Sequence, residues 1–527
     1  MNTSEQITYI GEHLWAGKLG NFFVVLSFVA ALLSTISYFF WSKNPLDLGW
    51  KKLARTAYRL HSAGVVGIVS TLFFMLYNHY FEYQYVWQHS NMSMKMKYIF
   101  SCFWEGQEGS FLLWTFWHMV IGNVLIRTAK NFEAPVMFML SFVQVFLASM
   151  LLGVVVGGTR IGMNPFLLLR EHPDFMNLPF VQGYIGDANY VAKAVNSAKG
   201  LNPLLQNYWM TIHPPTLFLG FALTIVPFIY AFAGVWKKEY ETWQKSALPW
   251  TFVGIAVLGI GILMGGAWAY EALSFGGFWA WDPVENASLV PWITLVAAGH
   301  VMIINKNKKG SLFITYFLCV ASFILVLYST FLTRSGILGD SSVHAFTDLG
   351  MEKQLLLFLL IFIFGAVLIL LKEKTTALIY GCLSALAGFC VFTFNIFPSH
   401  VLIGWGLLTC FFIVWGYSKF FPKDKTEDSL SSREFWMFIG SLMLLLSAVI
   451  ISLFTSTPIF NKLLAQFIDK KGAPFDAYDY NKWTLPFAII IMLLSGFAQY
   501  LKYSKSDMKQ FFRNNIIALV LSLSIGI

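Results

Sequence analysis

Long apolar runs alternate with short polar segments along the whole chain. About fourteen of these runs approach 20 residues, the length that a helix needs to cross the hydrocarbon core of a bilayer. Backbone groups in lipid must pair within their own segment, which favours helices. The pattern therefore predicts an all-α, polytopic transmembrane helix bundle of about 14 spans, which we place at 19–41, 58–79, 109–127, 135–157, 211–236, 249–270, 289–305, 311–332, 353–371, 376–395, 400–418, 434–457, 484–502 and from 514 to the end.

Lysine and arginine gather in alternate loops between these spans. With the N-terminus outside, every inner loop is basic, from Lys43–Arg59 after the first span to Lys502–Arg513 before the last. This distribution fits the positive-inside rule. We therefore expect one integral membrane domain over 1–527, with a multi-pass topology, an outer N-terminus and functional loops on the outer face. The outer segments are then 80–108, 158–210, 271–288, 333–352 and 458–483, of which 158–210 is the longest.

The composition agrees with a membrane protein. Hydrophobic residues make up 57% of the chain and charged residues only 12%, against roughly a quarter in soluble domains. The net charge of +9 follows from orientation and gives no reason to expect nucleic-acid binding. The five cysteines form no CxxC pair and most lie inside apolar runs, so we interpret them as small hydrophobes rather than redox centres or metal ligands.

The segment SFGGFWAWDPVENASLVPW (274–292) combines aromatic residues, glycines and acids. Trp279 and Trp281 would share one face of an extended segment, and Gly276 and Gly277 allow a flat partner to approach the backbone. A planar, mostly apolar ligand such as haem suits this platform. The simpler alternative is that these tryptophans only anchor the chain at the membrane interface.

The acids after Trp281 have a structural interpretation. Asp282 can cap the next helix, Pro283 suits its first position, and Glu285 has the spacing of a capping box. Asp282 and Glu285 are also the candidates for proton transfer, and the sequence leaves both interpretations open.

Histidines flank this segment on the outer side. His213 begins a span in TIHPPTLFLG, and His344 lies in the outer loop SGILGDSSVHAF. Two imidazoles can hold a six-coordinate haem iron, although each alone could be an ordinary interfacial histidine. His300 lies 11 residues into its span, and an ionisable group at that depth is a functional candidate. It either binds a second haem or packs with a hydrogen bond, the role that we favour for His61 and His118.

The motifs resemble the haem-handling family that is marked by a tryptophan-rich WWD segment, and most closely its CcmF branch of cytochrome c haem lyase subunits. The resemblance rests on seven segments that follow in the family's order: YVWQHSN (85–91), EGSFLLW (108–114), LNPLLQN (201–207), HPPTLFLGF (213–221), GGFWAWDPVENAS (276–288), FLTRSGILGDSSVHAF (331–346) and SSREFWMFIGSL (431–442).

This resemblance implies that haem b lies over the WWD segment, with His213 and His344 as axial ligands. It also implies a second, transmembrane haem b, for which His300 is one ligand. The chain departs from the family pattern at Phe275, where a tryptophan is expected, and at Gln107, where a histidine is expected. Region 375–421 resembles an additional helix pair. The second ligand of the transmembrane haem and a large outer domain lie beyond the matching segments, so we expect a C-terminally incomplete chain.

The implied activity is thioether formation between haem and the CxxCH segment of an apocytochrome c, in a bacterial inner membrane. The implied partners are apocytochrome c, a haem chaperone of the CcmE type and a CcmH-type subunit that handles thiols. Two other functions stay open: a haem exporter, and a haem-b electron-transfer subunit. Transporters tend to contain repeated halves and broken helices, which this sequence does not display.

Overall fold

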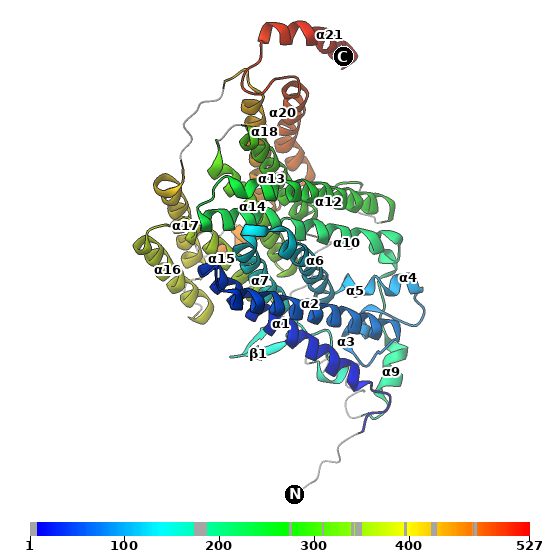
Figure 1. Cartoon of the computed structure of the whole chain (residues 1–527). Helices are drawn as coiled ribbons and strands as arrows, with labels where there is room; N and C mark the ends of the chain where they lie inside the picture. Colours follow the sequence, from blue (N-terminus) through cyan, green and yellow to red (C-terminus); the bar gives the residue numbers. More distant parts are fainter. Residues whose placement is uncertain are drawn as a thin grey trace. The chain divides into compact units, whose positions relative to one another are not determined.

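The computed structural model is almost entirely α-helical (Figure 1). It describes residues 8–172, 187–272, 277–307, 310–338, 342, 350–394, 398–422, 429–465, 467 and 472–526. Within this part, the sequence's long apolar runs all form helices, because a helix pairs every backbone group inside its own segment. The predicted polytopic helical bundle is therefore confirmed.

Twelve segments of the described chain are long and apolar enough to span a membrane. They contain α1 (Leu14–Lys43), α2 (Leu48–Tyr77), α6 (Gln107–Thr128), η1 with α7 (Lys130–Phe132, Glu133–Ser149), α10 with α11 (Tyr208–Leu223, Ile225–Lys237), α12 (Thr242–Ala272), α13 (Pro283–Asn307), α14 (Leu312–Arg334), α16 with η5 (Lys374–Phe389, Cys390–Phe394), α17 (Pro398–Phe420), α18 (Arg433–Thr455) and α20 (Ala477–Ala498). The two other expected spans are also helical, as α15 (Glu352–Leu368) and α21 (Met508–Gly526).

The chain forms two compact units. The first comprises 1–225, 256–279 and 348–354, and the second comprises 226–255, 280–347 and 355–527. The division falls between Trp279 and Ala280, inside the tryptophan-rich segment.

In the first unit, α1 packs against α2 and α7, and α6 packs against α2, α7 and α10. A Cβ at Gly64 would lie 2.9 Å from the backbone nitrogen of Ser27. Only glycine allows α1 and α2 to approach this closely, which is the usual function of small residues between membrane helices. Short helices outside these spans complete the unit: α3 (Gln84–His89), α4 (Met96–Ile99) and α5 (Cys102–Glu105).

Region 150–210 carries structure of its own. The fourth span was expected to reach residue 157, but α7 ends at Ser149 and a hairpin follows, formed by β1 (Val154–Val156) and β2 (Thr159–Ile161). Gly157 and Gly158 both have positive φ, at 55° and 77°, which a two-residue turn of this kind requires. Further along lie η2 (Leu169–Glu171), α9 (Tyr190–Ser197) and η4 (Pro203–Leu205).

In the second unit, α13 packs against α14 and α18, and α18 packs against α20. Their shared core contains Val290 and Ile293 of α13, Ala448 and Ile451 of α18, and Tyr480 of α20. The short α19 (Thr457–Leu464) follows α18.

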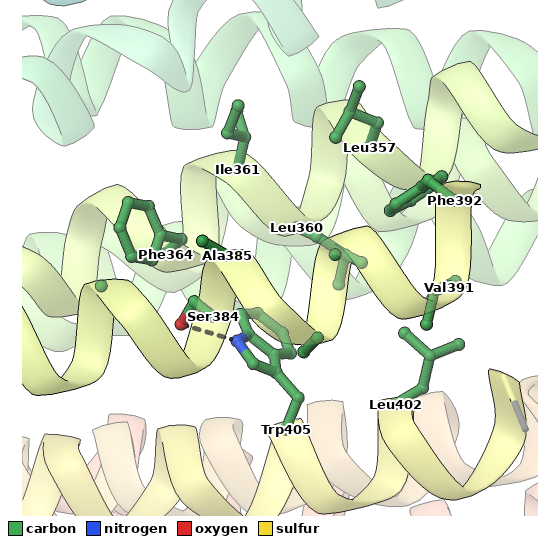
Figure 2. A pocket seen from close by; sticks show the side chains of 13 residues that line it. Leu357, Leu360, Ile361, Phe364, Ser384, Ala385, Val391, Phe392, Leu402 and Trp405 are labelled. Atoms are coloured by element: carbon green, nitrogen blue, oxygen red, sulfur yellow. Dashed lines mark hydrogen bonds between the residues drawn. The ribbon is translucent and has the colours of Figure 1, made fainter. Parts of the chain in front are cut away.

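A second cluster of the same unit joins α15, α16 and α17 around the buried Tyr380. A cavity of about 270 Å³ lies between these helices and is lined mostly by apolar side chains. Figure 2 shows these side chains and one hydrogen bond among them, in which the Trp405 indole donates to the Ser384 hydroxyl. Helices α16 and α17 correspond to the additional pair expected in 375–421.

Candidate functional site

His213 lies in the first turns of α10, within the first unit. Its Nδ1 donates to the Gly261 carbonyl of α12 at 2.9 Å. Because a carbonyl can only accept, Nδ1 carries the proton and the lone pair lies on Nε2. This is the tautomer that an iron ligand requires, with its other nitrogen oriented by a hydrogen bond.

The surroundings of His213 are aromatic and closely packed. The Trp268 ring of α12 meets the imidazole edge to face, with centroids 5.7 Å apart. A Cβ at Gly265 would lie only 2.9 Å from His213 Cε1. Three residues of α12, one helical turn apart, therefore position this imidazole: Gly261 by a hydrogen bond, Gly265 by its small size and Trp268 by ring contact.

The end of α12 is fixed to the start of α10 by one carboxylate. Glu271 accepts from the Tyr208 hydroxyl at 2.6 Å and from the Trp209 indole at 2.7 Å. The Trp104 indole also donates to the Met210 carbonyl at 2.9 Å. The local sequence gives no signal for these contacts, because they join segments about 60 or 100 residues apart.

The glycine pair and its neighbours are only partly described. Phe275 and Gly276 lie outside the described residues. Gly277 has φ +139°, a conformation that side-chain-bearing residues rarely adopt, and no described residue lies within 4 Å of the place of a Cβ. Phe278 packs against Gly266 of α12, and Trp279 is half-buried. The positive φ therefore explains why glycine occupies position 277. The open space around it would let a ligand approach the backbone closely.

The predicted cap of α13 is confirmed. In the second unit, Asp282 Oδ1 accepts from the Val284 amide at 2.8 Å, and Pro283 occupies the first helical position. Glu285 Oε2 accepts from the amides of Ala280 and Asp282 at 3.0 and 3.1 Å. Both carboxylates therefore satisfy backbone donors at the start of α13.

Trp281 departs from the extended conformation that was expected for it. Its φ of +58° is left-handed, so the extended-strand argument for a shared face with Trp279 does not hold. The ring stacks on Tyr480 of α20, with centroids 5.2 Å apart and planes 8° from parallel. Its indole donates to Asn481 at 2.9 Å. Asn286 donates to the Trp281 carbonyl and to Thr455, which holds this turn against α18.

Trp281 also borders a cavity of about 240 Å³ on its own unit. Its lining includes Asp282 and the aromatic rings of Phe454, Phe475 and Tyr480. Phe454 and Phe475 are stacked, with centroids 3.9 Å apart. The second tryptophan of the motif therefore belongs to an aromatic pocket built from α18, α20 and the segment between them, which pattern reasoning on 274–292 could not reveal.

His300 and His344 have different outcomes. His300 lies half-buried on α13, and its Nδ1 donates to the Val296 carbonyl one turn earlier at 2.8 Å. This bond also places the lone pair on Nε2. His344 lies outside the described residues. Ser342, two positions earlier, donates to Asp282 Oδ1 at 2.8 Å, so the chain just before His344 returns to the start of α13.

Comparisons with known proteins agree with the resemblance in the sequence. Residues 104–338 match the family model described as "Cytochrome C assembly protein". A relative from Pseudomonas fluorescens, "Cytochrome c-type biogenesis protein CcmF", is 32% identical over 358 residues, which cover 68% of this chain and 50% of the relative. The Escherichia coli K12 protein of the same name is 26% identical over 90% of this chain and 62% of the relative. The chain is therefore similar to the CcmF-type cytochrome c assembly proteins over about two thirds of its own length.

The structure supports the same fold assignment. A solved structure of "Cytochrome c Heme Lyase CcmF" superimposes with a TM-score of 0.64 and 22% identity, covering 99% of this chain and 67% of that one. The chain spans about half the length of the first curated relatives that it matches. It shares the helical architecture of the solved protein over nearly its whole length.

Proposed function

We propose that this chain acts in cytochrome c maturation as a haem lyase subunit that presents haem to an apocytochrome at the outer membrane face. Haem b is the substrate, held over the segment that contains Phe275, Gly276, Gly277, Trp279 and Trp281, with His213 and His344 as axial ligands. The location is a bacterial inner membrane, with the N-terminus outside.

The observation that carries this proposal is the geometry of His213. Its Nδ1–H is committed to the Gly261 carbonyl, so the lone pair on Nε2 has the orientation and tautomer that iron needs. Trp268 lies edge to face against the imidazole, and the resemblance to the family brings the same motif order. These residues fit a porphyrin better than they fit an interfacial anchor, which needs neither a fixed tautomer nor a glycine at 265.

The reaction adds each cysteine thiol of a CxxCH segment across a haem vinyl group: sulfur bonds to one vinyl carbon and the proton goes to the other, without net redox change. The chain's own residues hold and orient the ring, and proximity supplies much of the rate. Asp282 and Glu285 accept backbone amides in the described geometry. We therefore assign them to the rigidity of the loop rather than to proton transfer.

His300 is proposed as a ligand of a second, transmembrane haem b. It lies at membrane depth on α13, and its hydrogen bond to Val296 places the lone pair on Nε2. The second ligand in the family lies beyond the segments that match here. We propose three partners from the family: an apocytochrome c, a CcmE-type haem chaperone and a CcmH-type thiol-handling subunit.

The test is His213→Ala in a strain that depends on this protein for cytochrome c. We expect holocytochrome c to fall at least tenfold while the variant stays in the membrane at normal abundance. His400→Ala, which removes an exposed histidine of α17, is the matched control. Normal assembly with His213→Ala would refute the ligand assignment. If His213→Ala also keeps its haem, export or electron transfer becomes the favoured function.

A further inference from the structure

The first unit contains a group of polar side chains buried at membrane depth. Tyr38 of α1, Tyr58 and His61 of α2, His118 of α6 and Gln144 of α7 all have no exposed surface. Polar groups are expensive inside a membrane protein, and ionisable ones in spans mark functional pathways by default. None of these five residues belongs to the haem site proposed above.

Tyr58 connects the group. Its hydroxyl donates to the His118 carbonyl at 3.2 Å and lies within hydrogen-bonding reach of Gln144. Its ring lies 5.6 Å from the His61 ring, centroid to centroid. Gln144 in turn donates to the Thr115 carbonyl at 3.0 Å, one turn before His118. These contacts join the side chains of Tyr58, His61 and Gln144 to one another and to the backbone of α6 at Thr115 and His118.

The helix packing makes room for this arrangement. A Cβ at Gly122 would lie 1.9 Å from the Tyr58 hydroxyl oxygen, so any other residue there would displace Tyr58. Ser34 and Ser141 hydrogen-bond across α1 and α7 at 2.9 Å, one turn before Tyr38 and Gln144 respectively. The same helix surfaces are polar over several turns.

Five side-chain atoms of this group lack a hydrogen-bond partner among the described residues: Tyr38 Oη, His61 Nε2, His118 Nδ1 and Nε2, and Gln144 Oε1. His61 Nδ1 donates to the Ser27 carbonyl at 3.0 Å, which places an acceptor lone pair on Nε2. A buried polar atom without a partner is costly. Such groups in native proteins are usually satisfied by ordered water, which needs two to four polar partners of this kind.

The polar neighbourhood extends to one end of the unit. Arg55 forms a two-pronged ion pair with Glu133, at 2.7 and 2.6 Å. Tyr38 lies within electrostatic range of Arg55, Glu133 and Tyr58. Arg55 belongs to the loop side that the lysine and arginine pattern assigns to the inner face. Titratable groups therefore continue from that face to the middle of α2 and α6.

We propose that these side chains hold a chain of ordered water molecules, which relays protons between the Arg55–Glu133 pair and His118. Each water accepts a proton from one neighbour and releases one to the next, so the relay needs no other reactant. The His118 imidazole approaches the Ala222 carbonyl of α10, the helix that carries His213. The relay is independent of the haem function proposed above.

The first test is radiolytic hydroxyl-radical footprinting of the full chain in lipid nanodiscs, which labels buried side chains only where ordered water adjoins them. We expect Tyr58 and His61 to be labelled at least tenfold faster than Tyr316. Tyr316 is the matched control, because it is buried on α14 but its hydroxyl donates to the Ala366 carbonyl at 2.7 Å. Equal, slow labelling of all three would overturn the proposal.

The second test examines the relay itself. The exchange of imidazole N–H for deuterium is followed by solid-state NMR on ¹⁵N-histidine-labelled protein in bilayers. Tyr38→Phe removes one hydroxyl without changing the shape of the side chain, and should slow exchange at His61 and His118 at least tenfold. Thr35→Val is the control, since that hydroxyl donates to Ala31 within α1. If the imidazole protons of His61 and His118 exchange at an unchanged rate in Tyr38→Phe, the proposed relay is wrong, even if water is present.

Discussion

Single residues decide how the imidazole of His213 is held. The imidazole donates to the Gly261 carbonyl and meets the Trp268 ring edge to face, and the absence of a side chain at Gly265 gives it space. The sequence predicted the histidine and its tryptophan-rich surroundings. It could not predict Gly261 and Gly265, because their role depends on how α10 and α12 face each other.

Gly265→Ala should therefore impair haem binding without removing any proposed ligand. The added methyl would lie 2.9 Å from His213 Cε1, closer than side chains normally approach, so the imidazole must rotate. We expect the haem content of the purified protein to fall several-fold, measured by its absorbance per protein. Gly404→Ala, where the added carbon meets no atom of the described residues within 4 Å, should retain haem. Full haem content in Gly265→Ala would mean that His213 is not a ligand.

Trp281 shows the limit of pattern reasoning at this scale. The motif predicted an exposed platform, whereas the described ring stacks on Tyr480 and donates to Asn481. These partners lie about 200 residues later in the chain, and nothing in the local sequence signals them. A platform at Trp281 therefore depends on α20 as well as on the motif.

At the scale of helices, the start of α13 is the best-predicted feature. The order Asp282, Pro283, Glu285 was sufficient to identify the cap, because capping depends on neighbours within one turn. The end of α7 was missed by several residues. Val154–Val156 continue the apolar run, and only the turn at Gly157 and Gly158 shows that they form a strand.

The two roles proposed for Asp282 can be separated by substitution. Asparagine is as good an N-cap as aspartate, whereas alanine costs about 1 kcal/mol. If Asp282 only caps α13, Asp282→Asn should keep thermal stability and cytochrome c assembly, and Asp282→Ala should lower both. Loss of assembly in a stable Asp282→Asn protein would instead assign proton transfer to this carboxylate.

Lys372, which lies between α15 and α16, makes the stability of the fold depend on pH. Its Nζ donates to the Val235 carbonyl at 2.8 Å, and burial, together with the positive charge of Lys238, lowers its pKa from 10.5 to about 8. Between these values the unfolded chain binds more protons than the folded one, so this residue makes stability rise as the pH rises from 8 to 10.5.

Lys372→Met should therefore unfold at a higher temperature than the parent at pH 7, and this advantage should shrink towards pH 10.5. Thermal unfolding in detergent at the two pH values measures the difference. Lys374→Met, at an exposed neighbour, controls for the loss of one positive charge. An advantage that is the same at both pH values would contradict the lowered pKa.

At the scale of the whole molecule, hydrophobic periodicity predicted nearly every helix, because lipid leaves the backbone little choice. The division into two compact units was not foreseen. It falls between Trp279 and Ala280, in the middle of a motif that reads as continuous. Domain limits depend on which helices pack together, and apolar runs do not encode their neighbours.

The proposed orientation can be tested by fusions. Alkaline phosphatase fused after Asn44 should be inactive, because the enzyme folds only in the oxidising outer compartment. A fusion after Asn91 should be active, since the loop 80–108 is placed outside. Protein abundance by immunoblot normalises both activities. The reverse pattern would invert the topology and move His213 to the inner side.

Gly64 has a mechanical consequence for the N-terminal part of the chain. With the backbones of α1 and α2 in contact at Ser27, neither helix can slide past the other without breaking many contacts together. A tip that pulls on the N-terminus in single-molecule force spectroscopy should extract both helices as one hairpin. Gly64→Leu should divide that rupture into two smaller events.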